Sequence, residues 1–261
     1  AGATASEGDF VMAEVHGAKG RIEIFEDFTG PEWIIAETAA SGAIGAFRIV
    51  GQGVADTDAG VLINETLLNG VATMTSPNAS DNDSVGLVTG TMFDVALMGT
   101  IVAECRVQFA DLDTKEFFFG FSDLNTDVHS MEGVLIHGAS TTVTLTASDL
   151  VGFLLSSELT DDEDWHMVYN GGTTTGETTS TSIDADDDAV AGEWQILRLE
   201  IAPNGTARWY IDGVLKQTQA GAVSTTTNLA MNCMLEIKGT GSNETADIDY
   251  IYISANRDWT V

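Results

Sequence analysis

The chain has 261 residues, 44% of them hydrophobic, and its 40 acidic against 10 basic residues give a formal net charge of −30. Such a polyanion repels phosphate backbones and anionic lipid headgroups, and the sequence contains no Lys/Arg cluster, so neither nucleic acid nor a membrane is an expected partner. No stretch approaches the roughly 18 consecutive apolar residues that a membrane-spanning helix needs.

Residues 1–21 are expected to form an N-terminal arm. The opening, AGATASEGDF, has neither the basic n-region nor the apolar h-region of a signal peptide. The arm either docks on a neighbouring molecule or is a partly ordered tail.

Short runs of alternating apolar and polar residues, interrupted by Gly, Asn, Asp, Ser and Thr, predict β-structure along almost the whole chain. The longest run is 100–109, where Cys105 lies on the apolar face and Glu104 and Arg106 lie on the opposite, wet face. Residues 115–122 include three consecutive Phe, which predicts a strand covered on both sides. Further strands are expected at 22–25, 47–50, 71–75, 85–88, 133–137, 142–146, 151–155, 165–169, 195–201, 206–211, 234–238 and 247–254.

This number of short strands with almost no helix predicts an all-β fold, an antiparallel β-sandwich or barrel. A helical turn is expected near 64–69, and the Thr- and Asp-rich segment 173–191 is expected to be a long loop. No internal repeat or linker is visible. The expected organisation is one domain at 22–254 with the arm before it and a short tail, 255–261, after it.

Two stretches carry a recognisable pattern. The first, GEWQILRLEIAPNGTARWYIDGVL at 192–215, resembles the hairpin of concanavalin A-like and laminin-G-like jelly rolls. In it, alternate apolar residues face one side of both strands, and Pro203, Asn204 and Gly205 turn the chain between them. The second pairs IEIFEDF at 22–28 with DIDYIYIS at 247–254, because the first and last strands of this superfamily commonly lie side by side.

Four further features belong together: the FEDF opening, the acidic, Lys-poor body, the hairpin and the short tail. With these features the layout as a whole is similar to jelly-roll virion proteins of tailed bacteriophages, especially marine ones, that decorate or cement the head. The resemblance implies a non-enzymatic structural protein on the outer capsid surface. It also implies a homo-oligomer, with a trimer favoured, bound to the major capsid protein. The alternative is a carbohydrate-binding module of the laminin-G/concanavalin type, used for adsorption to a host or glycan.

The jelly rolls that the chain resembles include glucanases, so the resemblance also raises the possibility of a catalytic site. Retaining glucanases place E-x-D-x-x-E on one strand, which sets two carboxylates about 5–5.5 Å apart. No such run occurs; Glu158, Asp161, Asp162 and Glu163 lack the alternation of a strand and are expected in a loop. The sequence also lacks a G-x-S-x-G elbow, a P-loop and a G-x-G-x-x-G motif after a strand. No catalytic or cofactor-binding residue is therefore predicted, and the chain is not expected to be an enzyme.

The four histidines, His16, His129, His137 and His166, share no close spacing and are expected at surface or edge positions, not as ligands. Calcium is the one cofactor that the sequence suggests, because hard cations bind several oxygen ligands and acidic loops supply such oxygens. Two loops offer such oxygens, from Asp161, Asp162 and Asp164 and from Asp184, Asp186, Asp187 and Asp188. No fixed calcium-loop pattern matches, so solvated acidic loops without a metal are the preferred interpretation.

Cys105 and Cys233 each lie on the apolar face of a predicted strand, which favours buried free thiols, with a disulfide between them as the alternative. A sugar-binding platform could be built from Trp33, Trp165 and Trp259, although core burial is favoured for Trp165.

Overall fold

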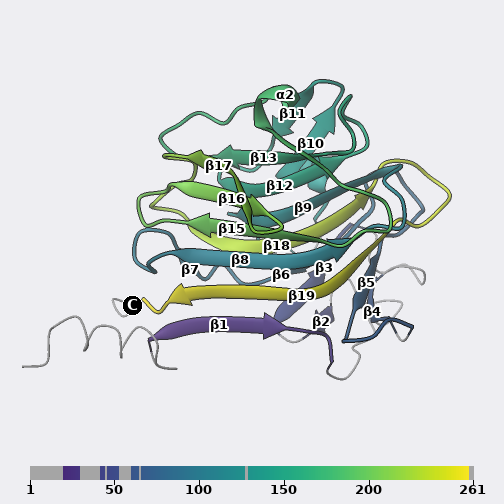
Figure 1. Cartoon of the computed structure of the whole chain (residues 1–261), viewed down its shortest axis with the longest axis horizontal. Helices are drawn as coiled ribbons and strands as arrows, with labels where there is room; N and C mark the ends of the chain where they lie inside the picture. The colour runs from purple at the N-terminus through teal and green to yellow at the C-terminus, as the bar shows by residue number, and fades with distance from the viewer. Residues whose placement is uncertain are drawn as a thin grey trace, which may run out of the picture.

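The computed structural model describes residues 20–29, 42–44, 46–52, 60–64, 66–126 and 129–258. In these ranges nearly all regular structure is antiparallel β, arranged as two stacked sheets (Figure 1). The predicted all-β sandwich is therefore confirmed. The arm up to residue 19, the tail from 259, His16, Trp33 and Trp259 lie outside the described residues. No helix among those described is long and apolar enough to cross a bilayer.

The first sheet has eight strands in the order β17-β16-β15-β8-β19-β5-β4, with β1 also paired to β19. The β1–β19 pairing runs from Arg21 opposite Asn256 to Glu26 opposite Ile251, so the first and last expected strands do lie side by side. Its strands are β1 (Arg21–Glu26), β4 (Gly60–Ile63), β5 (Ala72–Thr75), β8 (Ile101–Gln108), β15 (Gln195–Ile201), β16 (Ala207–Ile211), β17 (Val214–Gln219) and β19 (Thr245–Asn256).

The second sheet has nine strands in the order β14-β13-β12-β9-β18-β6-β3-β2, with β7 paired to β18. Every residue of β9 is buried, which confirms that this strand is covered on both faces. Its strands are β2 (Gly42–Ile44), β3 (Phe47–Val50), β6 (Ser84–Val88), β7 (Phe93–Asp94), β9 (Lys115–Ser122), β12 (Leu150–Ser156), β13 (Asp164–Asn170), β14 (Asp184–Asp188) and β18 (Asn228–Ile237).

The core between the sheets is aromatic. Trp165 is fully buried, as expected, and packs edge-on against Phe117 and Phe153. Trp209 is also fully buried, and its indole N–H donates to the carbonyl of Gly152 in the opposite sheet at 2.8 Å. Each such ring contributes about 1.5–3 kcal/mol by leaving water. Cys105 and Cys233 are buried and free, as the strand pattern favours.

A cover lies on the outer face of the nine-stranded sheet. It consists of η1, a π-helical turn (Met131–Leu135), the hairpin of β10 (Ile136–Ala139) and β11 (Thr142–Leu145), and α2 (Ser180–Ile183). Figure 1 shows α2, β10 and β11 grouped beside β13 and β12. The cover explains why β9 and β12 are buried at all positions.

Several expectations for individual elements were wrong. The strand expected at 133–137 begins as η1, because the Ser130 hydroxyl accepts a hydrogen bond from the Gly133 amide and bends the chain. The loop expected at 173–191 contains α2 and β14. The segment 66–70 forms turns and bends without a helix.

Candidate functional site

Two glutamates lie side by side on the outer face of the nine-stranded sheet, beneath the cover. The β9–β18 register places Glu116 opposite Glu236, and both residues are fully buried. Lys238 follows two residues after Glu236 and points the same way, since side chains alternate along a strand. We call the group formed by Glu116, Glu132, His137, Glu158, Glu236 and Lys238 the Lys238 cluster.

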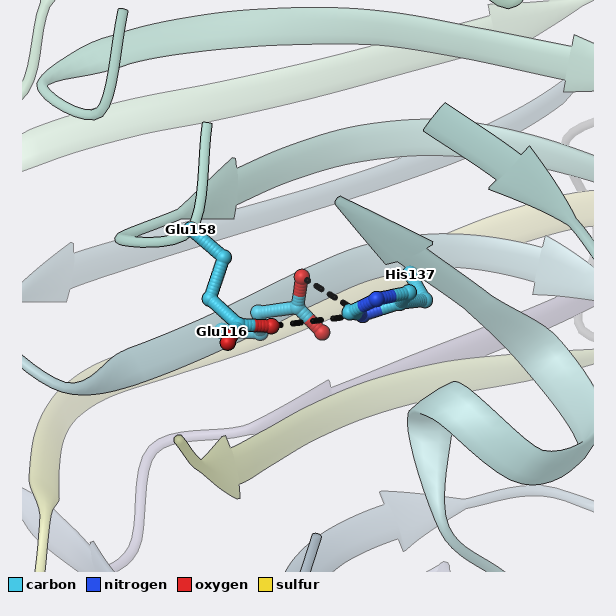
Figure 2. A group of neighbouring side chains, drawn as sticks. All are labelled: Glu116, His137 and Glu158. Carbon is cyan, nitrogen blue, oxygen red and sulfur yellow. Dashed lines mark ion pairs between the residues drawn. The ribbon is translucent and has the colours of Figure 1, made fainter. Parts of the chain in front are cut away.

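The Lys238 ammonium is the centre of this cluster. Its side chain is 1% exposed, and it forms ion pairs with four carboxylates. The distances from Nζ are 2.9 Å to Glu132 Oε2, 3.4 Å to Glu158 Oε2, 3.4 Å to Glu236 Oε1 and 3.6 Å to Glu116 Oε2. Figure 2 shows the carboxylates of Glu116 and Glu158 on the same side of the His137 ring, with His137 Nδ1 3.6 Å from Glu116 Oε1 and 3.5 Å from Glu158 Oε2.

The buried carboxylates hold the cover in place. Glu116 Oε1 accepts hydrogen bonds from the Gly138 amide at 2.7 Å and from the Ser156 hydroxyl at 2.5 Å. Glu236 accepts from the amides of Met131 and Glu132 in η1. By accepting these hydrogen bonds, each glutamate fastens part of the cover to the sheet.

Burial and charge shift the titration of this cluster. Burial, reinforced by Glu116, raises the pKa of Glu236 to about 8 although Lys238 opposes the shift. The pKa of Lys238 is raised, because its carboxylate neighbours outweigh the effect of burial. The hydrogen bond with Glu116 raises the pKa of His137, whereas the hydrogen bond from Lys238 lowers the pKa of Glu132. Lys238 therefore stays charged at neutral pH and Glu236 is largely protonated.

Two features limit the reactions that this cluster could catalyse: a substrate cannot reach its buried carboxylates, and these carboxylates already accept hydrogen bonds from the protein. A retaining glycosidase needs two carboxylates about 5–5.5 Å apart on either side of a bound sugar. Glu116 and Glu158 are close enough together, but Glu116 is fully buried and already bonded to the cover and Ser156. Oxygen and nitrogen atoms of Glu116, His137 and Glu158 could also surround a metal ion. The Lys238 ammonium already supplies positive charge to both glutamates, so we assign the cluster a structural role.

A second candidate lies on the outer face of the eight-stranded sheet, across β16, β15, β8, β19 and β1. Cross-strand registers align Tyr210, Arg198, Glu104, Tyr252 and Phe25 in one row. This surface, which we call the Tyr/Arg face, carries three of the four tyrosines and four of the ten basic residues of the chain. Its members are Arg21, Glu23, Phe25, Glu104, Arg106, Arg198, Glu200, Arg208, Tyr210, Tyr250 and Tyr252.

Side chains on the Tyr/Arg face hold one another in fixed positions. Arg198 pairs with Glu104 at 3.1 Å and with Glu200 at 2.8 Å. Arg106 pairs with Asp249 at 2.6 Å and stacks 4.6 Å above the ring centre of Trp194. The rings of Phe25 and Tyr250 lie 5.8 Å apart, and Phe25 is 60% exposed. The face thus presents ordered aromatic and guanidinium groups to solvent.

The histidines and acidic residues named in the sequence analysis lie in different surroundings. His129 and His166 are fully buried, so the expected surface or edge positions were wrong for both. Burial lowers the pKa of His129 to about 4, which keeps this side chain neutral. Glu158 joins the Lys238 cluster and not a pair with Asp161 or Asp162. Of the two acidic segments, Asp161, Asp164 and Asp184 come together, while Asp187 pairs with Lys216 at 2.6 Å.

No family model and no curated protein sequence matches this chain. Solved structures do match it. Peanut lectin has a TM-score of 0.56 at 10% identity, covering 90% of this chain and 97% of the lectin. A protein of unknown function from Shewanella oneidensis has a TM-score of 0.53 at 11% identity, covering 100% of this chain and 98% of that protein. The β-glucanase of Bacillus licheniformis has a TM-score of 0.51 at 15% identity, covering 88% of this chain and 97% of the glucanase. At these identities the likeness shows the fold alone, a concanavalin A-like jelly-roll β-sandwich.

Proposed function

We propose that the chain is a non-catalytic binding module that contacts a protein partner through the Tyr/Arg face. The observation that carries this proposal is the gathering of tyrosines and arginines on one face of a chain whose net charge is −30. Tyr, Trp and Arg are the residues most enriched where proteins bind one another tightly.

The internal pairing of the face favours tight contact. Arg198 and Arg106 are already held by carboxylates, so little side-chain freedom is lost when a partner binds. The four arginines also reduce local negative charge where two acidic surfaces would otherwise repel. Because the two most buried carboxylates of the Lys238 cluster bind the cover, the proposal involves no turnover.

Within this class we propose the role that the sequence resemblance implies, an accessory protein on the outer surface of a tailed-phage capsid. The partner is then the major capsid protein, and the module acts as a homo-oligomer, with a trimer favoured. The acidic, Lys-poor composition supports this role, since a strongly charged particle resists aggregation.

Sedimentation with intact capsids from the source tests the role. We expect the purified chain to pellet with capsids, and the double variant Phe25→Ser/Tyr252→Ser to lose at least about tenfold in affinity, since removing hot-spot residues costs about 2 kcal/mol or more. The control is Leu97→Ser, which removes an exposed apolar side chain from the loop between β7 and β8. Light scattering of the free chain reports the oligomer. A monomer that never pellets contradicts the capsid role.

Carbohydrate binding is the second candidate, favoured by the exposed ring of Phe25 beside Tyr250 and Tyr252. Aromatic rings at a surface can stack on the apolar faces of sugars. A glycan array probed with the wild type and with Phe25→Ser/Tyr252→Ser separates the two candidates. A glycan signal that the double variant abolishes, without any capsid binding, would favour the carbohydrate-binding module.

A further inference from the structure

The pairing of β13 with β14 brings two acidic segments together. Asp164 lies opposite Asp188 and His166 opposite Asp184, and Asp161 lies in the turn that precedes β13. One carboxylate oxygen from each of Asp161, Asp164 and Asp184 lies within 4.8 Å of the other two. We call these three residues the Asp161 site.

The Asp161 site concentrates negative charge. Three carboxylates meet there, and Asp188 lies opposite Asp164 as a fourth. In the Lys238 cluster the crowding of carboxylates is relieved by an ammonium in their midst. Beside the Asp161 site, by contrast, the ammonium of Lys216 pairs with Asp187 and not with these three carboxylates.

A buried histidine points into the same site. His166 is fully buried, and neither of its ring nitrogens makes a hydrogen bond with the described part of the chain. Its Nε2 lies 3.4 Å from Asp161 Oδ2. Both carboxylate oxygens of Asp161 are likewise shielded from solvent without a hydrogen-bond donor. Buried polar groups are rarely left in this state, so the geometry calls for a further positive partner.

We propose that Asp161, Asp164 and Asp184 bind a calcium ion. An ion that lies about 2.3–2.6 Å from each oxygen can bridge oxygens as far apart as these. Calcium takes about six to eight oxygen ligands, and water supplies the remainder because Asp164 and Asp184 are partly exposed. The bound ion ties the turn before β13 to the edge strand β14.

The ion also explains how an edge strand can have the sequence DADDD. Only Ala185 of β14 is buried, so little apolar contact holds this strand to β13. A cation shared between Asp184 and the β13 side supplies an attachment that the hydrophobic effect does not.

Calcium titration of the chelator-treated full chain tests the proposal. We expect equilibrium dialysis to find one calcium ion per chain. We also expect the melting temperature to rise by roughly 5–10 °C when free calcium is a hundredfold above its Kd. Asp164→Asn and Asp184→Asn should each abolish both effects. Asp162→Asn, which removes the same charge from an exposed neighbour, should leave them unchanged.

The Asn variants are expected to fold, because each removes one charge from a group of like charges. Their melting temperatures without calcium should therefore be no lower than that of the chelated wild type. Three results would overturn the proposal: no calcium bound to the wild type, a calcium shift that persists in Asp184→Asn, or a response to zinc alone. Since the Asp161 site shares no residue with the Tyr/Arg face, none of these results bears on partner binding.

Discussion

Lys238 places its ammonium among four carboxylates, of which Glu116 and Glu236 are fully buried. Replacing one partner of a buried ion pair leaves the other charges without compensation, at a cost of about 3–5 kcal/mol. We expect Lys238→Met to lower the free energy of unfolding by that amount in urea denaturation. Lys216→Met is the matched control, because the partly exposed Lys216–Asp187 pair should contribute less than about 1 kcal/mol. Equal losses in the two variants would show that the cluster does not hold the cover.

Glu236 should make stability depend on pH. Its pKa rises from 4.5 in the unfolded chain to about 8 in the folded protein, mainly through burial. The folded state therefore keeps a proton that the unfolded state releases, so this contribution is complete below about pH 4.5 and is lost as pH rises to about 8. The loss is on the order of 4 kcal/mol.

Glu236→Gln mimics the protonated side chain and should remove this part of the pH dependence. The measurement is urea denaturation at pH 5 and at pH 8, compared between wild type and variant. Glu193→Gln, at an exposed position, serves as the control and should retain the wild-type slope. If the free energy of unfolding changes between pH 5 and pH 8 by the same amount in Glu236→Gln as in the wild type, then the folded protein does not hold a proton on Glu236. In that case Glu236 is ionised in the folded protein at pH 5 as well.

At the scale of elements, β9 and β12 approach one another more closely than side chains allow. Gly120 lies opposite Gly152, and a Cβ on Gly120 would be 2.2 Å from the carbonyl oxygen of Val151 and 2.5 Å from the Gly152 Cα. Both neighbours are backbone atoms in a strand that is buried at every position, and they have little room to move. We expect Gly120→Ala to cost about 1–3 kcal/mol of stability through overpacking, measured by denaturant unfolding.

The control for this effect is Gly90→Ala, two residues beyond the end of β6, where a Cβ would meet nothing within 4 Å. This substitution should change stability by no more than about 0.5 kcal/mol in either direction. A Gly120→Ala variant as stable as Gly90→Ala would mean that the two central strands can separate without cost.

The elements that could be predicted from the sequence are those with an apolar stripe. Strands β9, β15 and β16 were expected within one residue of their observed bounds, because each has a face that must be buried. The edge strand β14 gave no such signal, since Ala185 is its one buried residue. The Lys238 cluster was missed for a related reason. Glu116 and Glu236 are far apart in sequence, and only the β9–β18 register makes them neighbours.

For the candidate sites, the sequence indicated residue types but not their grouping. The acidic loops were visible as possible calcium ligands, yet the choice of Asp161, Asp164 and Asp184 depends on how β13 pairs with β14. The Tyr/Arg face likewise exists only because five strands are aligned in register. Alternation predicts that Glu104 and Arg106 face outward; it does not predict which residues lie beside them.

At the scale of the whole molecule, the net charge of −30 acts against the compact state. Like charges repel more strongly in the folded protein than in the expanded chain, and salt weakens this repulsion. The screening length falls from about 10 Å at 0.1 M to about 3 Å at 1 M ionic strength. We therefore expect the melting temperature to rise when NaCl increases from 0.1 M to 1 M in the presence of a chelator, which keeps the Asp161 site from contributing. Choline chloride should act similarly, since screening depends on ionic strength and not on the cation. A rise in melting temperature with NaCl that choline chloride does not reproduce would instead indicate specific sodium binding. A fall in melting temperature with both salts would show that ion pairs such as Arg106–Asp249 outweigh the general repulsion.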